Sequence, residues 1–153
     1  MPDSVPINPL SPARAIQQAR LVALAILAGQ IVFLGIAAYL VANGNGGDAP
    51  SGGPPADTSR TLLAVAMFLF AVLVPIAFLL RRRLLSPVDG EAPAPDLYLK
   101  AQIVFFGLCE MPTLMFLVVA LVQQDLMPGA PLAVLTIMVQ ALNLPKAEDL
   151  PGA

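Results

Sequence analysis

The sequence predicts an all-α integral membrane protein, a four-helix bundle of two helical hairpins in which the fourth helix is short. Composition is the first reason, because 58% of the residues are hydrophobic and only 12% are charged, about half the charged fraction of a soluble domain. The second is a mean hydropathy of +0.80 that is concentrated in long uncharged runs, as in helices surrounded by lipid. The third is that connectors rich in proline and glycine separate these runs.

The first hairpin begins with a cytoplasmic tail and helix start at residues 1–18. Within it, Ser11-Pro12 favours a helix start, because serine can accept from free first-turn amides and proline at the first position loses no hydrogen bond. The uncharged run at 21–42 is about 33 Å long at the helical rise and predicts a first span over 19–42. A cleaved signal peptide is the competing interpretation. It is disfavoured because the run exceeds a typical apolar signal region and Leu40, three residues before Asn43, is not small.

The first hairpin continues with a loop and a second span. Residues 43–60 are rich in Gly, Pro and Asp, a composition that predicts a flexible external loop. Residues 61–80 carry no charge and predict the second span, which Pro75 should bend near its far end.

The second hairpin follows a cytoplasmic loop at 81–100. A third span is predicted over 101–122, then a short external loop at 123–130 and a fourth segment over 131–144, before a cytoplasmic tail at 145–153. Only about 14 residues of the fourth segment are clearly helical, fewer than a bilayer usually needs. That segment either spans by drawing in the residues before it or is a re-entrant or interfacial piece.

The basic residues predict the orientation of the spans. All of them except Arg60 fall on one side of the predicted membrane: Arg14, Arg20, Arg81, Arg82, Arg83, Lys100 and Lys146. The positive-inside rule places this side, and with it both termini, in the cytoplasm. Arg20, the three consecutive arginines and Lys100 are therefore interpreted as topology anchors.

The residue types argue against catalysis and cofactor binding. Histidine is absent and Cys109 is the single cysteine, which removes the commonest metal and haem ligands and any intramolecular disulfide. No phosphate-binding glycine loop, nucleophile elbow or carboxylate pair is present. We therefore expect no enzyme activity, no metal, no cofactor and no nucleic acid partner.

The candidate site is Glu110, which lies in the apolar stretch FFGLCEMPTLMF. It follows Lys100 closely enough to lie about 15 Å into the membrane, where the carboxyl must be protonated, hydrogen-bonded or paired with a cation. Gln30 follows Arg20 by the same interval on a helix that runs in the same direction, so we expect the Gln30 amide to meet the Glu110 carboxyl at one depth. In the fourth segment, Gln140 can reach the bundle interior, whereas Asn143 is placed at the interface.

The stretch GLCEMPTLMFLVVALV around Glu110 resembles the acidic helix of the proteolipid, or c-type, subunits of rotary ATPases. That resemblance implies that Glu110 binds a transported proton or sodium ion, with Gln30 as a second ligand. It extends over about 16 residues, and in that family the acid belongs to the second helix of a hairpin instead of the first. The whole chain is also similar to small four-span bacterial membrane proteins with a glutamate in the third span, a resemblance that implies no known activity. The low lysine count and the bias toward Ala, Leu, Pro and Gly suit a bacterium with GC-rich DNA, which predicts a location in the inner membrane.

Two functions remain open from the sequence. The first is a structural or accessory multi-pass membrane protein in which Glu110 and Gln30 form a buried polar contact. The alternative is an oligomeric component that translocates protons or sodium through Glu110. The expected partners are the lipid bilayer and either further copies of the chain or other membrane subunits.

Overall fold

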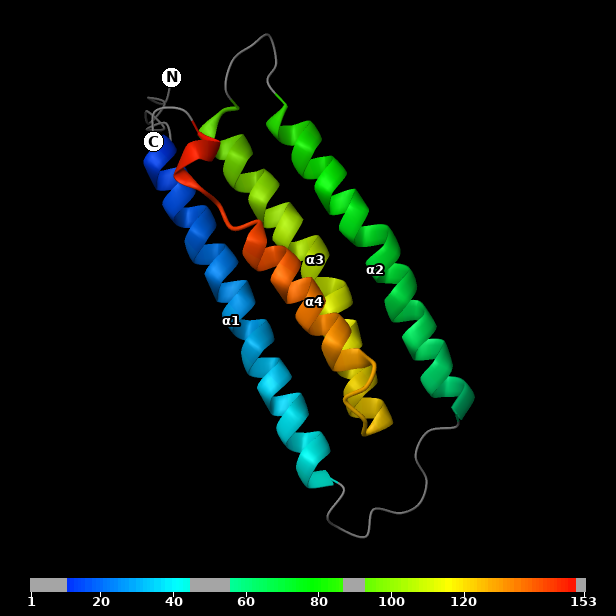
Figure 1. Ribbon diagram of the computed structural model, residues 1–153. Helices are drawn as coiled ribbons and strands as arrows, with labels where there is room; N and C mark the ends of the chain where they lie inside the picture. Colours follow the sequence, from blue (N-terminus) through cyan, green and yellow to red (C-terminus); the bar gives the residue numbers. More distant parts are fainter. Residues whose placement is uncertain (1–10, 45–55, 87–92, 151–153) are drawn as a thin grey trace, which may run out of the picture.

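The computed structural model describes residues 11–44, 56–86 and 93–150. Within these ranges the chain forms four α-helices and one 3-10 turn, and no strand (Figure 1). The elements are α1 (Pro12–Gly44), α2 (Ala56–Leu85), α3 (Pro95–Gln123), α4 (Gly129–Leu142) and η1 (Ala147–Asp149). The predicted all-α helical bundle with a short fourth helix is thereby confirmed. The predicted tail at 1–10, most of the loop at 43–60, part of the loop at 81–100 and the last residues lie outside the described ranges.

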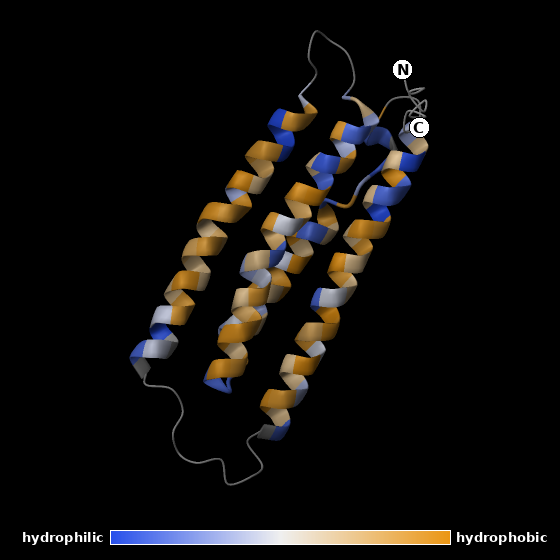
Figure 2. Ribbon diagram, turned by 180° about the vertical axis from the view of Figure 1, so that it is seen from behind, coloured by the Kyte–Doolittle hydropathy of each residue, from blue (hydrophilic) through white to orange (hydrophobic). Residues whose placement is uncertain are grey.

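Three of the helices are long and apolar enough to cross a membrane. The candidate spans are Pro12–Asn43, Arg60–Leu85 and Pro95–Gln123. Each span is longer than predicted, because each helix continues beyond its apolar run into the polar residues that flank the run. The predicted start at Ser11-Pro12 is present, and the Ser11 carbonyl accepts from the Ala15 amide at 3.0 Å. Hydrophobic residues cover the middle of these helices and hydrophilic residues gather near their ends (Figure 2).

Helix α3 is the centre of the bundle. It packs against α1, α2 and α4, and α4 also contacts α1. In Figure 1, α4 lies in front of α3, between α1 and α2. The opposite side of α3 is left uncovered, and exposed apolar side chains form it: Ile103, Val104, Met111, Leu114 and Val118.

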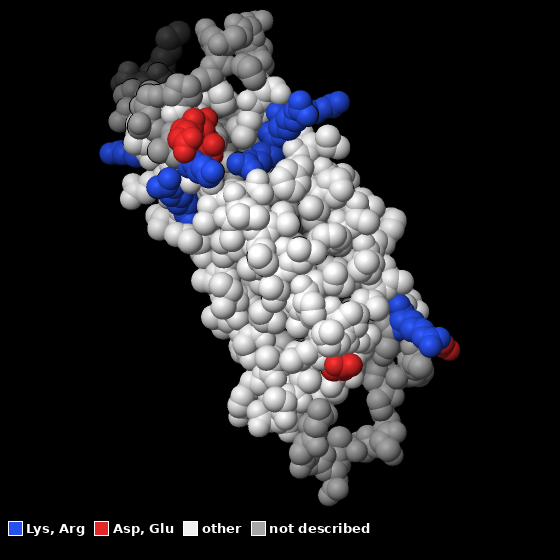
Figure 3. Space-filling view, in the orientation of Figure 1, with Lys and Arg blue, Asp and Glu red and all other residues white. Residues whose placement is uncertain are grey.

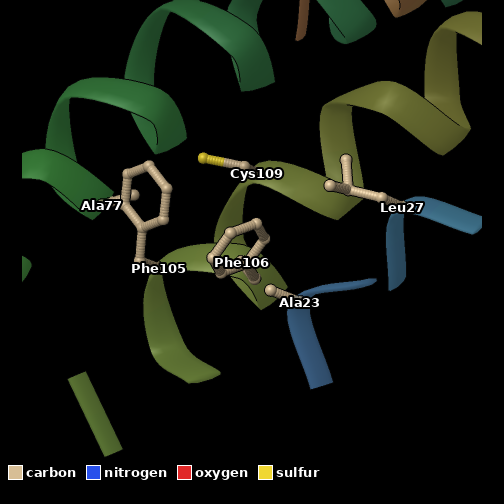
Figure 4. Close-up of a cluster of buried hydrophobic side chains, with 6 residues drawn as sticks. All are labelled: Ala23, Leu27, Ala77, Phe105, Phe106 and Cys109. Atoms are coloured by element: carbon tan, nitrogen blue, oxygen red, sulfur yellow. The ribbon is translucent and has the colours of Figure 1, made fainter. Parts of the chain in front are cut away.

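Three apolar clusters succeed one another along the bundle. The middle cluster joins Ala23 and Leu27 of α1 and Ala77 of α2 to Phe105, Phe106 and Cys109 of α3 (Figure 4). At one end, Tyr98 packs with Leu150 and with three small or branched residues of α1: Ala15, Ile16 and Ala19. At the other end the cluster contains Ala66, Phe116, Leu117, Val119 and Ala133. Alanine on α1, α2 and α4 lets each backbone approach the large side chains of α3 closely.

The approach of α4 to α3 is closest at Gly129. A methyl group added there would lie inside the contact radius of the Phe116 carbonyl oxygen and 3.1 Å from the Cβ of Ala120. The first residue of α4 must therefore lack a side chain for the helix to enter the bundle at this angle.

After α4 ends at Leu142, the chain continues along the bundle as an irregular segment that contains the short 3-10 turn η1. We call residues 143–150 the C-terminal clasp. The Pro145 carbonyl accepts from Arg20 Nε at 2.8 Å, the Lys146 amide donates to Asp149 Oδ2 at 3.0 Å, and Leu150 is buried. The segment predicted as a cytoplasmic tail at 145–153 is packed against the helices as far as Leu150.

Candidate functional site: a polar seam and a mid-span carboxyl

Five polar side chains are buried among the residues that the structure describes, and we call them the polar seam. They are Gln30 of α1, Gln102 and Thr113 of α3, and Thr136 and Gln140 of α4. Each is at most 1% exposed. None carries a charge, so the seam is polar and electrically neutral.

The centre of the seam is a hydrogen bond between two glutamines. Gln30 Nε2 donates to Gln140 Oε1 at 3.3 Å, joining the first and last helices of the chain across the bundle. Gln140 therefore reaches the interior as predicted, and it takes the place that Glu110 was expected to fill as the partner of Gln30.

The two threonines of the seam are satisfied locally. Thr113 Oγ1 donates to the Cys109 carbonyl at 3.0 Å, and Thr136 Oγ1 donates to the Leu132 carbonyl at 2.9 Å. Both bonds are the one-turn back-bonds that hydroxyl side chains make within helices. Each hydroxyl oxygen retains acceptor capacity toward the interior.

The glutamines, in contrast, are incompletely satisfied. Gln30 Oε1 and Gln140 Nε2 are buried and have no hydrogen-bond partner. Gln102 makes no hydrogen bond within the usual distance, but its side chain interacts with the Tyr98 hydroxyl one turn earlier. An unsatisfied buried polar group costs on the order of 1–3 kcal/mol, and native proteins contain few such groups.

The clasp closes the end of the bundle beside the seam. Arg81 donates to Asn143 Oδ1 at 2.9 Å and lies 5.1 Å from the centroid of the Phe105 ring, a cation–π contact. The Tyr98 hydroxyl donates a hydrogen bond to Asp149 Oδ2 at 2.8 Å. Together with the Arg20 bond, these contacts attach the clasp to α1, α2 and α3.

The residues predicted as topology anchors have different environments. Arg20 and Arg81 turn toward the clasp, as described above. Lys100 is exposed and pairs with Asp96 one turn earlier, at 3.4 Å, while Arg82 and Arg83 are exposed. Positive side chains gather at the end of the bundle that carries the clasp (Figure 3), as the positive-inside prediction requires of one end.

Glu110 lies near the middle of the α3 span, at the edge of its uncovered face. The carboxylate is half-buried, whereas Met111 beside it is 58% exposed and Leu114 one turn later is 37% exposed. The carboxyl makes no hydrogen bond or ion pair with any residue in the described ranges. The expected Gln30–Glu110 bond is therefore absent, because Glu110 points outward while Gln30 points to α4.

The described part of the chain offers no metal centre. No three side chains among its His, Cys, Asp and Glu residues come together where they could hold a metal ion. Cys109, next to Glu110 in sequence, is buried in the middle apolar cluster and so points away from the carboxyl by about 100° of helix rotation.

Sequence reasoning missed Gln102 and Tyr98 of α3 and Asp149 of the clasp. The spacing of the polar residues could have indicated which faces of the helices are polar. Tyr98 and Gln102 are four residues apart, as are Thr136 and Gln140. Polar residues at helical spacing in an apolar run share one face. The Tyr98–Asp149 bond has no such signal, since it joins segments distant in sequence.

Comparison of the chain with protein-family models, with curated proteins and with solved structures finds no match in any of the three.

Proposed function

We propose that the chain is a structural or accessory integral membrane protein that assembles with further copies of itself in the bilayer. In this proposal it crosses the bacterial inner membrane several times, with both ends in the cytoplasm, and the uncovered face of α3 is the contact between copies. The three apolar helices support the membrane location. The contact of Leu150 with Ala15 and Ile16 supports placing both ends on the same side.

The observation that carries the proposal is the unpaired carboxyl of Glu110. It lies near the middle of an apolar span and has no partner among the described residues. Ionisable groups at this depth are costly unless they are paired, and they normally face a protein partner or an aqueous cavity. In this proposal, another molecule in the membrane supplies the partner that the described helices do not.

A second copy supplies that partner without any further component. A protonated carboxyl is both a donor and an acceptor, so two Glu110 side chains can bond reciprocally across a two-fold axis, where each copy presents the same face. The neighbouring Ile103, Gly107 and Leu114 provide an apolar surface for the contact. Gly107 has free space where a side chain would be, so another helix can approach closely there.

The test is the mass of the purified protein in lipid nanodiscs, measured by native mass spectrometry. The wild-type chain should form a dimer, Glu110→Leu should be mostly monomeric, and Glu110→Gln should retain the dimer because an amide also donates and accepts. Met111→Leu, on the same face, is the matched control and should behave as wild type. A dimer of undiminished strength in Glu110→Leu, or a monomeric wild type, would remove the basis of the proposal.

A second function is favoured by the same half-exposed carboxyl. A lipid-accessible mid-span acid is the group that an oligomeric proton- or sodium-translocating component would use. Labelling of Glu110 by a hydrophobic carbodiimide, measured by mass spectrometry, separates the two functions. Labelling that sodium suppresses at constant pH supports ion binding, whereas labelling that responds to dilution of the dimer and not to sodium supports the assembly role.

A further inference from the structure

We infer that a hollow on one side of α2 binds an anionic phospholipid, with the lipid phosphate on Arg83 and the first part of an acyl chain against Ile76 and Leu80. The inference depends on the membrane location of α2, and it does not depend on Glu110 or on the assembly proposed above. The observation that carries it is an apolar hollow that ends at an arginine with no partner among the described residues.

Four side chains of α2 line the hollow: Ile76, Leu79, Leu80 and Arg83. Their spacing of three, four and seven residues places them on one side of the helix, as a stripe about 10 Å long with the arginine at its end. The volume of about 260 Å³ is smaller than that of pockets that enclose a whole small-molecule ligand, about 300–1,000 Å³. The hollow therefore suits a segment of a flexible chain better than a complete soluble molecule.

The apolar part of the hollow belongs to a candidate membrane span. Ile76, Leu79 and Leu80 lie within the span Arg60–Leu85, and Arg83 lies near its end. The three apolar side chains are 39%, 62% and 39% exposed, so the helices of the described structure leave them largely uncovered. In a bilayer these side chains contact lipid chains, and the long arginine side chain reaches the headgroup region.

The arginines of this segment point in different directions. Arg81 and Arg83 are separated by about 200° of helix rotation. Arg81 bonds Asn143 and lies over the Phe105 ring, whereas the Arg83 side chain is exposed and makes no hydrogen bond or ion pair with any residue in the described ranges. A free guanidinium can bind a phosphate through two parallel N–H donors.

The charge around the hollow selects the headgroup. Positive side chains gather at this end of the bundle (Figure 3), and no carboxylate is among the described residues that line the hollow. An anionic phospholipid supplies a phosphate for the arginine and an acyl chain for the apolar stripe in one molecule, and such lipids accumulate against basic residues next to membrane spans. A free phosphate would leave the apolar stripe unused, and a zwitterionic lipid would bring a second cation to the arginine.

The test is photo-crosslinking of the full-length protein in vesicles of phosphatidylethanolamine and phosphatidylglycerol. Each lipid in turn carries a diazirine near the start of an acyl chain, and mass spectrometry locates and counts the crosslinks. We expect residues 76–80 to favour the phosphatidylglycerol probe by about fivefold, the factor for one basic residue at an anionic membrane surface. Leu24 is the matched control, because it is exposed and lies one turn from Arg20, which is already bonded to Pro145. The two probes should label it about equally.

Two variants connect the preference to the arginine. Arg83→Gln removes the charge at an exposed position and should lower the preference at 76–80 to that at Leu24. Arg14→Gln removes an exposed charge of α1 at the same end of the bundle and should leave the preference at 76–80 unchanged. Both variants lower the net charge equally, so they separate a local site from general attraction to the membrane surface.

Several results would overturn the inference. Equal labelling of 76–80 by the two probes would mean ordinary lipid contact, and an equal loss of preference in Arg14→Gln and Arg83→Gln would mean general surface attraction. Displacement of the phosphatidylglycerol probe by millimolar inorganic phosphate would mean that the anion alone is recognised. The absence of crosslinks at 76–80 with both probes would mean that protein, such as a second copy of the chain, covers the hollow.

Discussion

Replacing Gln140 by leucine should destabilise the protein, and replacing Gln30 at the same time should restore much of the loss. The two side chains are bonded at 3.3 Å and are at most 1% exposed. Gln140→Leu leaves the Gln30 amide buried with neither of its polar atoms bonded to the protein. The double variant leaves no polar group of the pair behind.

The size of the effect follows from the burial. A single substitution removes one hydrogen bond and leaves a buried amide unpaired, which costs on the order of 1–3 kcal/mol. Hydrogen bonds between membrane helices couple by about 0.6 kcal/mol on average and by at most about 1.7 kcal/mol. We therefore expect the double variant to be less destabilised than the sum of the single variants, by about 0.6–1.7 kcal/mol.

The protein contains its own probe for the measurement. It has no tryptophan, but Cys109 is its single cysteine and is fully buried. A thiol-reactive fluorogenic maleimide in detergent micelles therefore reports the loss of packing around α3. Titration with a denaturing detergent, followed by this reaction and by circular dichroism, gives the free energy of unfolding for the four members of the cycle.

The predicted coupling is contradicted if the effects of the two substitutions on the free energy of unfolding simply add. Additivity within error would mean that Gln30 and Gln140 do not interact in the folded protein, and the seam as described would be wrong. Gln17→Leu, at an exposed position of α1, is the control for a change of glutamine to leucine, and its effect should stay within about 0.5 kcal/mol.

Three further substitutions test other parts of the structure. Arg81→Ala should lower the free energy of unfolding by about 1–3 kcal/mol in the same titration, because it removes a hydrogen bond to the clasp and a cation–π contact. Arg82→Ala is the control and should be nearly neutral. Equal effects of the two substitutions would contradict the different roles given to these arginines. Gly129→Leu should cost at least about 2 kcal/mol or prevent folding, because α4 must move away from α3, and a wild-type melting temperature would contradict the close packing. Tyr98→Phe removes the bond between α3 and Asp149 and leaves Asp149 with the Lys146 amide of the clasp itself as donor. Hydrogen–deuterium exchange should therefore rise over the clasp with little change in α2, and unchanged exchange there would mean that the Tyr98 bond does not hold the clasp.

The helices themselves were predictable because lipid sets a strict requirement. Every backbone polar group in the bilayer must be bonded within the chain, so a long uncharged run has few alternatives to a helix. The runs over 19–42, 61–80 and 101–122 accordingly fall inside α1, α2 and α3. The shortness of α4 was also predictable from the apolar run, but its extension by the clasp was not, because hydropathy carries no information about Arg20 bonding to the Pro145 carbonyl.

The partner of Gln30 was predicted wrongly for a specific physical reason. Two residues at equal depth on parallel helices can meet only if both point toward the interface between the helices. Cys109 and Thr113 point inward on α3, and Glu110 is rotated from Cys109 by about 100°, which brings it to the uncovered edge. Sequence fixes the depth of a residue in a span, whereas its direction depends on which neighbours the helix has.

The direction of Glu110 and the composition of the seam follow from one arrangement. α3 has three neighbours, and α4 covers only one of its sides. On the covered side, polar side chains of different helices can bond to each other. Uncharged glutamines are enough to form such a bond, as Gln30 and Gln140 do. On the uncovered side no helix in the described ranges packs against α3, so the carboxyl of Glu110 has no hydrogen-bond partner among the described residues, and the partner proposed above would come from a second copy. Glu110 lies at the edge of the uncovered face, about 80° of helix rotation from Gln102, so the polar residues that pack within the bundle and the carboxyl that has no partner among the described residues occupy neighbouring sides of α3.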